Sequence, residues 1–303
     1  MDQYLPFDQR GPSPVRRILI TLGLVMLGML LAGAVTFGVI SLMGFDFQDL
    51  ANNFSESSPI NERNAMRLAA LLSQVFNFLI PAIVASYIFY KSDWSSYQRI
   101  DAPPLAKYLG LGALMIVAAF PLAQFTYWLN SLMPLPEVLM DMEDSTAELI
   151  KGILVMNSPL ELLFNLLVIS LIPAIAEEMI FRGIIQDSFE KIISNPHIAI
   201  AVSAIVFSAI HMQFEGFLPR VILGLVLGYL FYWTRNLWVP IAAHAVNNGL
   251  QVIGAYFYPE EIASMEIEAL DSSVILPGLI SLVITAAVGW YILKLKDGER
   301  MVY

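Results

Sequence analysis

The chain has no cysteine among its 303 residues, and only 14% of those residues are charged. The missing cysteine excludes disulfides, thiol nucleophiles and thiolate metal sites. Soluble domains carry charge on roughly a quarter of their residues, and this chain is also 57% hydrophobic. The shortage of charge therefore excludes an ordinary soluble domain, and we predict an all-α, polytopic membrane protein.

Several catalytic signatures are also missing. The sequence contains no Gly-x-Ser-x-Gly, no Gly-x-Gly-Asp and no His-Glu-x-x-His. These absences argue against a serine hydrolase of the nucleophile-elbow type, a presenilin-type aspartyl protease and the common helical zinc-protease motif. Together with the missing thiol, they leave few known routes to peptide hydrolysis.

Long apolar segments fill most of the chain. A membrane helix needs about 20 apolar residues, and we expect eight such helices at 18–43, 65–90, 105–132, 159 onward, 197–212, 217–233, 237–256 and 273–293. The first segment is too long for a signal peptide and is expected to remain as an anchor. We therefore predict a tail at 1–15, one membrane domain at 16–296 and a second tail at 297–303.

The positive charges predict the orientation of the bundle. The net charge is −10, but basic and acidic residues alternate between successive connections. The N-terminal tail, the connections after the second, fourth and sixth segments and the C-terminal tail are basic, and the other connections are acidic. By the positive-inside rule, both termini are expected in the cytoplasm.

Charged residues occur inside the fourth apolar segment. The stretch "AIAEEMIFRG" at 174–183 contains Glu177, Glu178 and Arg182. Glu178 and Arg182 are spaced i,i+4 and can pair, which lowers the cost of both charges. Glu177 lies about 100° further round a helix and is left for another partner. The alternative that this helix ends before Glu177, with the charges at the membrane interface, stays open.

The residues after this stretch favour a long helix. Apolar residues continue at helical spacing up to Asn195 and Pro196, so we predict a helix from 159 to about 194. Pro173 lacks a backbone N–H and frees the carbonyl of Ile169, which predicts a kink just before the motif.

Two of the three histidines lie in other apolar segments. "FSAIH" places Phe207 and His211 on one helix face, and "HAVNN" places His244 and Asn248 on one face with Asn247 close by. A single histidine in a membrane helix is as often a satisfied structural residue as a functional one. Ionisable groups on three apolar helices together indicate function, because their convergence supplies a base, imidazoles and an amide donor for water activation and oxyanion stabilisation.

The three motifs resemble those of a known family. Glu-Glu-x-x-x-Arg, Phe-x-x-x-His and His-x-x-x-Asn occur in this order on successive helices, within about 159–250. This combination resembles the CPBP (Abi) family of intramembrane proteases, which includes the Rce1-type CAAX prenyl endopeptidases. The segments before 159 show no matching motif.

The resemblance implies a role for each motif residue. Glu177 would be the general base, with His211 positioning or deprotonating the attacking water. His244 and Asn248 would form the oxyanion hole. The supporting residues are Glu178, Arg182, Phe207 and Asn247. The family has been described both as metal-independent glutamate proteases and as metalloproteases.

The expected cofactor and partners follow from these roles. We favour chemistry without a metal; the alternative is zinc held by Glu177, His211 and His244 with one open position. The expected substrate is a membrane-associated peptide or protein, in the plasma (inner) membrane of a prokaryote, with no nucleic-acid partner. The alternatives are a non-catalytic scaffold or immunity protein of the same fold and, less favoured, a proton-coupled transporter, for which the expected repeat-related broken helices are missing.

Overall fold

The computed structural model describes residues 11–259 and 271–300, which form helices and connecting loops without a strand. In chain order the elements are α1 (Pro14–Leu42), α2 (Phe47–Asn53), α3 (Ile60–Gln74), η3 (Val75–Leu79), α4 (Ile80–Tyr90), η4 (Lys91–Asp93), α5 (Trp94–Tyr97), α6 (Ala106–Ala118), α7 (Phe120–Ser131), α8 (Glu137–Leu154), α9 (Pro159–Asn165), η5 (Leu166–Leu171), α10 (Ile172–Ile180), η6 (Phe181–Gln186), α11 (Asp187–Ile192), α12 (Pro196–Ala209), α13 (Phe217–Thr234), α14 (Trp238–Phe257), η8 (Ser272–Val274) and α16 (Ile275–Arg300). The segments η3, η5 and η6 are π-helical turns inside longer helices. The predicted all-α membrane bundle is confirmed.

Helices occupy all eight predicted positions, but they are not equally long or apolar. Within the described residues, six segments are long and apolar enough to cross a membrane: Pro14–Leu42, Ile60–Tyr97, Ala106–Ser131, Pro159–Ile192, Phe217–Thr234 and Ser272–Gly298. The other two predicted segments correspond to α12, which has only 14 residues, and α14, which has 20 residues but carries polar side chains on one face. The predicted histidines lie on α14 (His244) and in the turn that follows α12 (His211).

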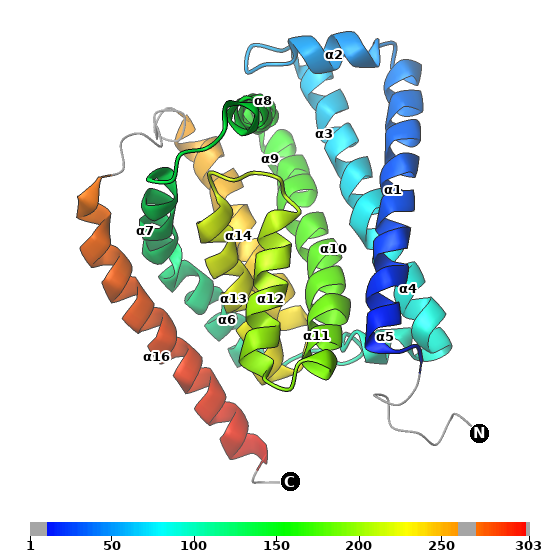
Figure 1. Cartoon of the computed structure of the whole chain (residues 1–303). Helices are drawn as coiled ribbons and strands as arrows, with labels where there is room; N and C mark the ends of the chain where they lie inside the picture. Colours follow the sequence, from blue (N-terminus) through cyan, green and yellow to red (C-terminus); the bar gives the residue numbers. More distant parts are fainter. Residues whose placement is uncertain (1–10, 260–270, 301–303) are drawn as a thin grey trace.

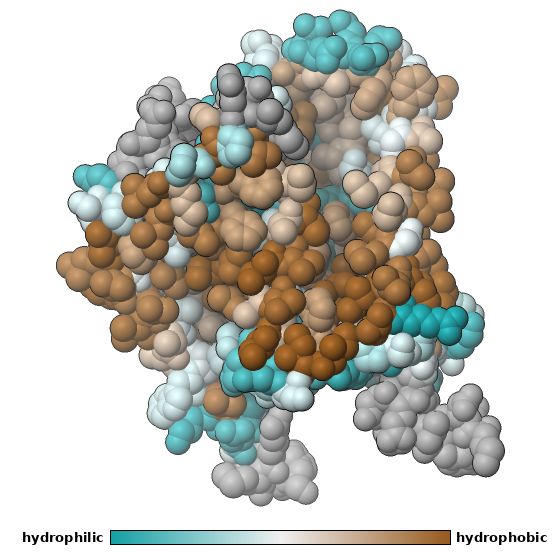
Figure 2. All heavy atoms as spheres, in the orientation of Figure 1, coloured by the Kyte–Doolittle hydropathy of each residue, from teal (hydrophilic) through white to brown (hydrophobic). Residues whose placement is uncertain are grey.

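The surface and the chain direction fit a membrane-spanning bundle. Figure 2 shows brown, apolar surface around the middle of the molecule and hydrophilic surface towards its two ends. We call these ends the α2 end and the α11 end, after the helices that lie there (Figure 1). The first turn of α1 and the last turn of α16 both lie at the α11 end (Figure 1), as an even number of crossings requires.

The motif-bearing helix runs continuously from α9 to α11. It ends at Ile192, because Ile193 is extended and Asn195 caps the next helix, whereas the sequence predicted an end near 194. The π-helical turn η5 precedes Pro173. The carbonyl of Ile169 accepts a hydrogen bond from the Asn248 side-chain amide at 3.2 Å. The polar side chain thus binds the carbonyl that the proline frees.

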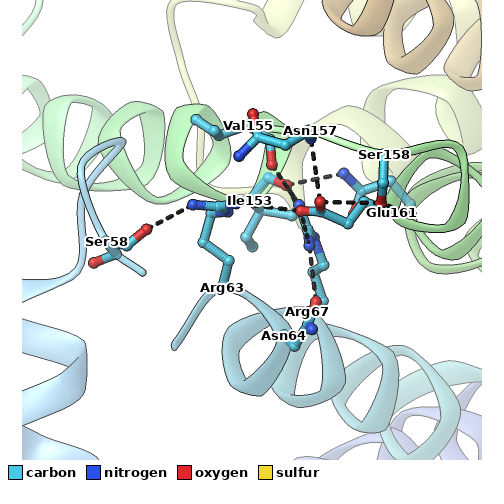
Figure 3. Close-up of polar contacts among 10 residues, drawn as sticks. Ser58, Arg63, Asn64, Arg67, Ile153, Val155, Asn157, Ser158 and Glu161 are labelled. Atoms are coloured by element: carbon cyan, nitrogen blue, oxygen red, sulfur yellow. Dashed lines mark hydrogen bonds and ion pairs between the residues drawn. The ribbon is translucent and has the colours of Figure 1, made fainter. Parts of the chain in front are cut away.

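A buried ion-pair cluster holds this helix at the α2 end (Figure 3). Glu161 lies 2.9 Å from Arg67 and 3.4 Å from Arg63, both on α3. The Arg67 guanidinium also donates to the carbonyls of Ile153 and Val155, just where α8 ends. The guanidinium thus bonds both a carboxylate and the unpaired carbonyls of a helix terminus. No sequence motif predicts this cluster.

A second cluster holds the same helix at the α11 end. Asp187 accepts from Lys191 at 2.6 Å and from Arg99 at 3.2 Å, and it lies 3.6 Å from Arg17 on α1. Both ends of the motif-bearing helix are therefore tied by charge to neighbouring helices. The rigid elements on which a site depends are in this way fixed around Glu177.

Helix α8 corrects the sequence analysis, which treated its acidic residues as part of a connection. The structure forms an 18-residue helix there. Leu149 and Ile153, spaced i,i+4, pack against the cluster that contains Leu50, Phe54 and Met66. The many acidic residues of α8 make its sequence polar overall, so the apolar stripe is not evident. A surface helix needs only one apolar face.

Two glycines on α13 allow α12 and η6 to approach closely. Gly224 and Gly228 are spaced i,i+4, the small-residue spacing of membrane helix contacts. Their carbonyls accept hydrogen bonds from the side chains of Arg182 at 3.1 Å and Gln186 at 3.0 Å. The glycines therefore place backbone acceptors where the motif arginine needs them.

Replacing Gly224 by leucine should destabilise the fold. A Cβ there would lie 2.9 Å from the Cβ and 3.0 Å from the Cα of Ala204 on α12, so backbone would have to move. Overpacking of this kind costs about 1–3 kcal/mol. The matched control is Gly110→Leu on α6, where a Cβ meets nothing within 4 Å. Thermal unfolding in detergent should show a lowered midpoint for Gly224→Leu alone; equal shifts in both variants would contradict the close contact.

Candidate active site

Three predicted site residues meet inside the bundle. The Glu177 carboxylate on α10 has its Oε2 atom 4.0 Å from Nε2 of His211 and 3.9 Å from Nε2 of His244. The side chains of Glu177 and His244 are 7% and 3% exposed, whereas that of His211 is 27% exposed. This cluster of three side chains is therefore buried on the side of α14 and solvent-accessible on the side of His211.

The two histidines reach the same depth because their helices begin at different levels. His211 lies far from the start of α12, where Pro196 to Ile198 are not buried. His244 lies only two turns into α14, but that helix begins inside the bundle, with Leu237 and Val239 fully buried. The backbone N–H of Leu237 is bonded to the carbonyl of Arg99. Because α14 begins deeper in the bundle than α12, His244 reaches the depth of His211 after fewer residues.

His211 does not lie within a helix as predicted. Helix α12 ends at Ala209, and Met212 has a positive φ of 54°. The turn nevertheless keeps the predicted i,i+4 relation, because Nδ1 of His211 bonds to the carbonyl of Phe207 at 2.8 Å. The end of the helix thus directs His211 towards Glu177.

Hydrogen bonds at Nδ1 define the tautomer of both imidazoles. Nδ1 of His244 bonds to Oε1 of Glu178 at 2.9 Å, and Nδ1 of His211 bonds to a carbonyl. Both partners only accept, so each Nδ1 must donate, and a neutral ring then carries its lone pair at Nε2. When both rings are neutral, three acceptor atoms, two Nε2 and Oε2 of Glu177, face one another. A group that supplies protons or positive charge satisfies such an arrangement.

Glu178 and Arg182 form the predicted pair, and Glu178 has a second contact. Oε1 of Glu178 accepts from Arg182 at 2.7 Å and from His244 at 2.9 Å, with both charged side chains almost fully buried. The Arg182 guanidinium also lies over the Phe207 ring at 4.6 Å. The sequence identified the i,i+4 pair, but the contact between Glu178 and His244 depends on how α10 packs against α14.

The two asparagines lie on α14, about one turn after His244. Asn248 donates to the carbonyl of Ile169, and its Oδ1 accepts from Asn247 at 2.9 Å. One N–H of the Asn248 amide is used in this way, and a second remains for another acceptor. The place of Asn248 on α14 is as predicted; its role in an oxyanion hole stays a prediction.

The spacing of the three acceptors can be compared with that of zinc ligands. Two ligands of a tetrahedral zinc stand about 3.3 Å apart, given bonds of about 2.05 Å. Two acceptors that share one water stand about 4 to 4.6 Å apart, given hydrogen bonds of about 2.8 Å. The separations of 4.0 and 3.9 Å lie at the lower end of the second range and above the zinc value. In the described residues, no three His, Asp or Glu side chains are grouped for a metal ion.

The fold and the site define a polytopic helical membrane protein with a carboxylate and two oriented imidazoles in its interior. Residues 159–250 match the family model described as type II CAAX prenyl endopeptidase Rce1-like. This match confirms the resemblance to the CPBP family of membrane proteases over the segment that carries the three motifs.

Three bacterial relatives match part of the chain. They are the putative membrane peptidase YdiL of Bacillus subtilis (34% identical over 89 residues, 29% of this chain and 36% of the relative), the membrane-embedded CAAX protease MroQ of Staphylococcus aureus (32% over 100 residues, 31% and 40%) and the uncharacterized protein YpbD of B. subtilis (30% over 86 residues, 27% and 41%). The aligned segments thus span about two fifths of each relative. No solved structure matches the chain.

Proposed function

We propose that this protein is an intramembrane endopeptidase that cleaves membrane-associated peptides or proteins by activated-water attack. The observation that carries the proposal is the convergence of Oε2 of Glu177 with Nε2 of His211 and Nε2 of His244 inside the bundle. The family match over 159–250 supports peptide hydrolysis as the reaction class.

The attacking water would lie between Glu177 and His211. A water that donates one proton to Oε2 and the other to Nε2 directs its lone pair away from both, towards a scissile carbonyl carbon. As the C–O bond forms, Glu177 takes the proton and later delivers it to the leaving amine nitrogen. The greater exposure of His211 is consistent with substrate entry on that side.

His244 would stabilise the oxyanion only in its protonated form. Neutral His244 has its lone pair at Nε2, because Nδ1 donates to Glu178. In the protonated form, Nε2–H of His244 and the second N–H of Asn248 would donate to the developing oxyanion.

A peptide-cleavage assay tests this proposal. The purified chain, reconstituted in lipid nanodiscs, is offered a library of internally quenched peptides with and without a C-terminal prenyl or acyl chain. The wild type should cleave part of the library and Glu177→Ala should not. A wild-type chain that binds library peptides without cutting them would instead identify a non-catalytic binding protein.

The proposed location is the plasma membrane of a prokaryote, with both termini cytoplasmic. The basic connections, the first turn of α1 and the last turn of α16 belong to the α11 end of the bundle (Figure 1), and the positive-inside rule assigns that end to the cytoplasm.

Chelation should leave the peptidase activity intact. The acceptor separations suit a shared water rather than zinc, and the Asn248 amide is a poor zinc ligand. Protein treated exhaustively with a chelator should therefore retain cleavage, and elemental analysis should find far less than one zinc per chain. Stoichiometric zinc, with activity lost on chelation and restored by zinc, would establish the metalloprotease alternative, in which Glu177, His211 and His244 hold the zinc.

A further inference from the structure

Two amide side chains lie in the middle of a membrane span without a hydrogen-bond partner among the residues that the structure describes. Gln74 ends α3 and Asn77 lies in the π-helical turn η3, both inside the span Ile60–Tyr97. The side-chain oxygen of each is buried and has no partner. Such a group costs about 1–3 kcal/mol, and lipid offers no water to satisfy it. An unpaired pair of amides at this depth therefore calls for a functional explanation.

Three other amide side chains of the protein have a structural role, because they bond to neighbouring segments. Gln98, Asn165 and Gln186 also have a buried unpaired oxygen, but each donates through its nitrogen to a neighbouring helix or loop. Within the described residues, neither Gln74 nor Asn77 makes any side-chain hydrogen bond. Neither amide therefore ties one helix to another.

The two amides lie close to the depth of Glu177. Helices α3 and α9–α10 run in the same direction (Figure 1) and η3 packs against α10. Phe78 packs on the hydrophobic cluster to which Met179 and Ile180 of α10 also belong. Asn77, the middle residue of η3, therefore lies within the range of depth covered by α10, whose nine residues span roughly 13 Å.

The rest of the bundle does not fully cover this part of the second span. Residues 71–79 are all half-buried, so no face of this segment is fully covered by the bundle. Figure 2 shows the surface hollowed between α3 and the α12–α13 hairpin. A π-helical turn in such a place is frequently functional, and Pro81 follows it as Pro173 follows η5.

We propose that Gln74 and Asn77 bind the main chain of the peptide substrate beside the scissile bond; this inference rests on the proposed function. A peptide drawn into the bundle loses water from its own N–H and C=O groups. A side-chain amide offers one acceptor and two donors, which complement a peptide group of any sequence. The unpaired oxygens of Gln74 and Asn77 accept substrate N–H groups, and their nitrogens donate to substrate carbonyls.

Near-isosteric apolar variants separate this role from a structural one. Gln74→Met and Asn77→Leu remove the amides while keeping most of the volume. Because an unsatisfied buried group is lost, thermal stability should equal or exceed that of the wild type. KM for a cleaved library peptide should rise about 3- to 10-fold in each variant and about 10- to 100-fold in the double variant, from net hydrogen-bond contributions. The turnover number kcat should change less than KM.

The matched control is Gln124→Met. Gln124 is an exposed glutamine in the span Ala106–Ser131 on α7, away from α10, and its replacement should change neither KM nor stability. A double variant that cleaves with wild-type KM overturns this inference alone, as does one with a lowered unfolding midpoint and unchanged KM. A wild type that cleaves no member of the library overturns the proposed function, and this inference with it.

Discussion

Replacing Glu177 by glutamine should leave the protein folded and lower kcat by about 10²- to 10⁴-fold, the usual contribution of a general base. Glutamine matches the shape of glutamate but cannot take a proton from water. The Glu177 carboxylate faces two Nε2 atoms, and a new amide N–H can donate to the lone pair of Nε2 of His211. The free energy of unfolding should therefore not fall.

The measurement compares kcat and the thermal unfolding midpoint of Glu177→Gln with those of the wild type. Glu148→Gln on the exposed face of α8 is the matched control, because it makes the same chemical change far from the three acceptors. If Glu177→Gln has the wild-type kcat, Glu177 is not the general base.

Replacing Glu178 by glutamine should instead damage the fold. Arg182 is 1% exposed and pairs with Glu178 at 2.7 Å. Removing one partner of a buried pair leaves an uncompensated charge and costs about 3–5 kcal/mol. We expect a low yield of folded protein and a lowered unfolding midpoint. If Glu178→Gln folds normally but is inactive, while Glu177→Gln fails to fold, the two carboxylates have been assigned in the wrong order.

A double variant distinguishes the structural role of Glu178 from its contact with His244. Glu178→Leu with Arg182→Met replaces the pair by apolar side chains, which is often neutral or stabilising, so folding should recover. His244 then has no acceptor at Nδ1, and cleavage should stay about 10- to 100-fold below wild type, as for the loss of other orienting partners. Recovery of both folding and cleavage would limit Glu178 to a structural role.

The sequence predicted the local features of the site well. The i,i+4 pair of Glu178 and Arg182, the separate direction of Glu177 and the carbonyl of Ile169 freed by Pro173 all follow from helix geometry over a few residues. The structure contains each of them. The ends of helices were less predictable, since the turn after Ala209 depends on how α12 meets α13.

Contacts between distant helices could not be read from the sequence. The pairing of Arg67 with Glu161 joins residues 94 positions apart, and nothing local in either helix indicates the partner. The acidic composition of α8 likewise concealed its apolar stripe, and the amides of Gln74 and Asn77 gave no periodic signal. Each becomes evident only when its neighbours in space are known.

The sequence by itself determined that this chain is a helical membrane protein and which residues share a helix face. Both follow from the cost of charge and of unpaired backbone in lipid, which constrains every segment separately. The tertiary structure decided that Glu178 orients His244, that α14 begins inside the bundle and that Glu177 faces the Nε2 atoms of two imidazoles. These features depend on the depth and packing of whole helices, which are set by contacts between segments far apart in the chain.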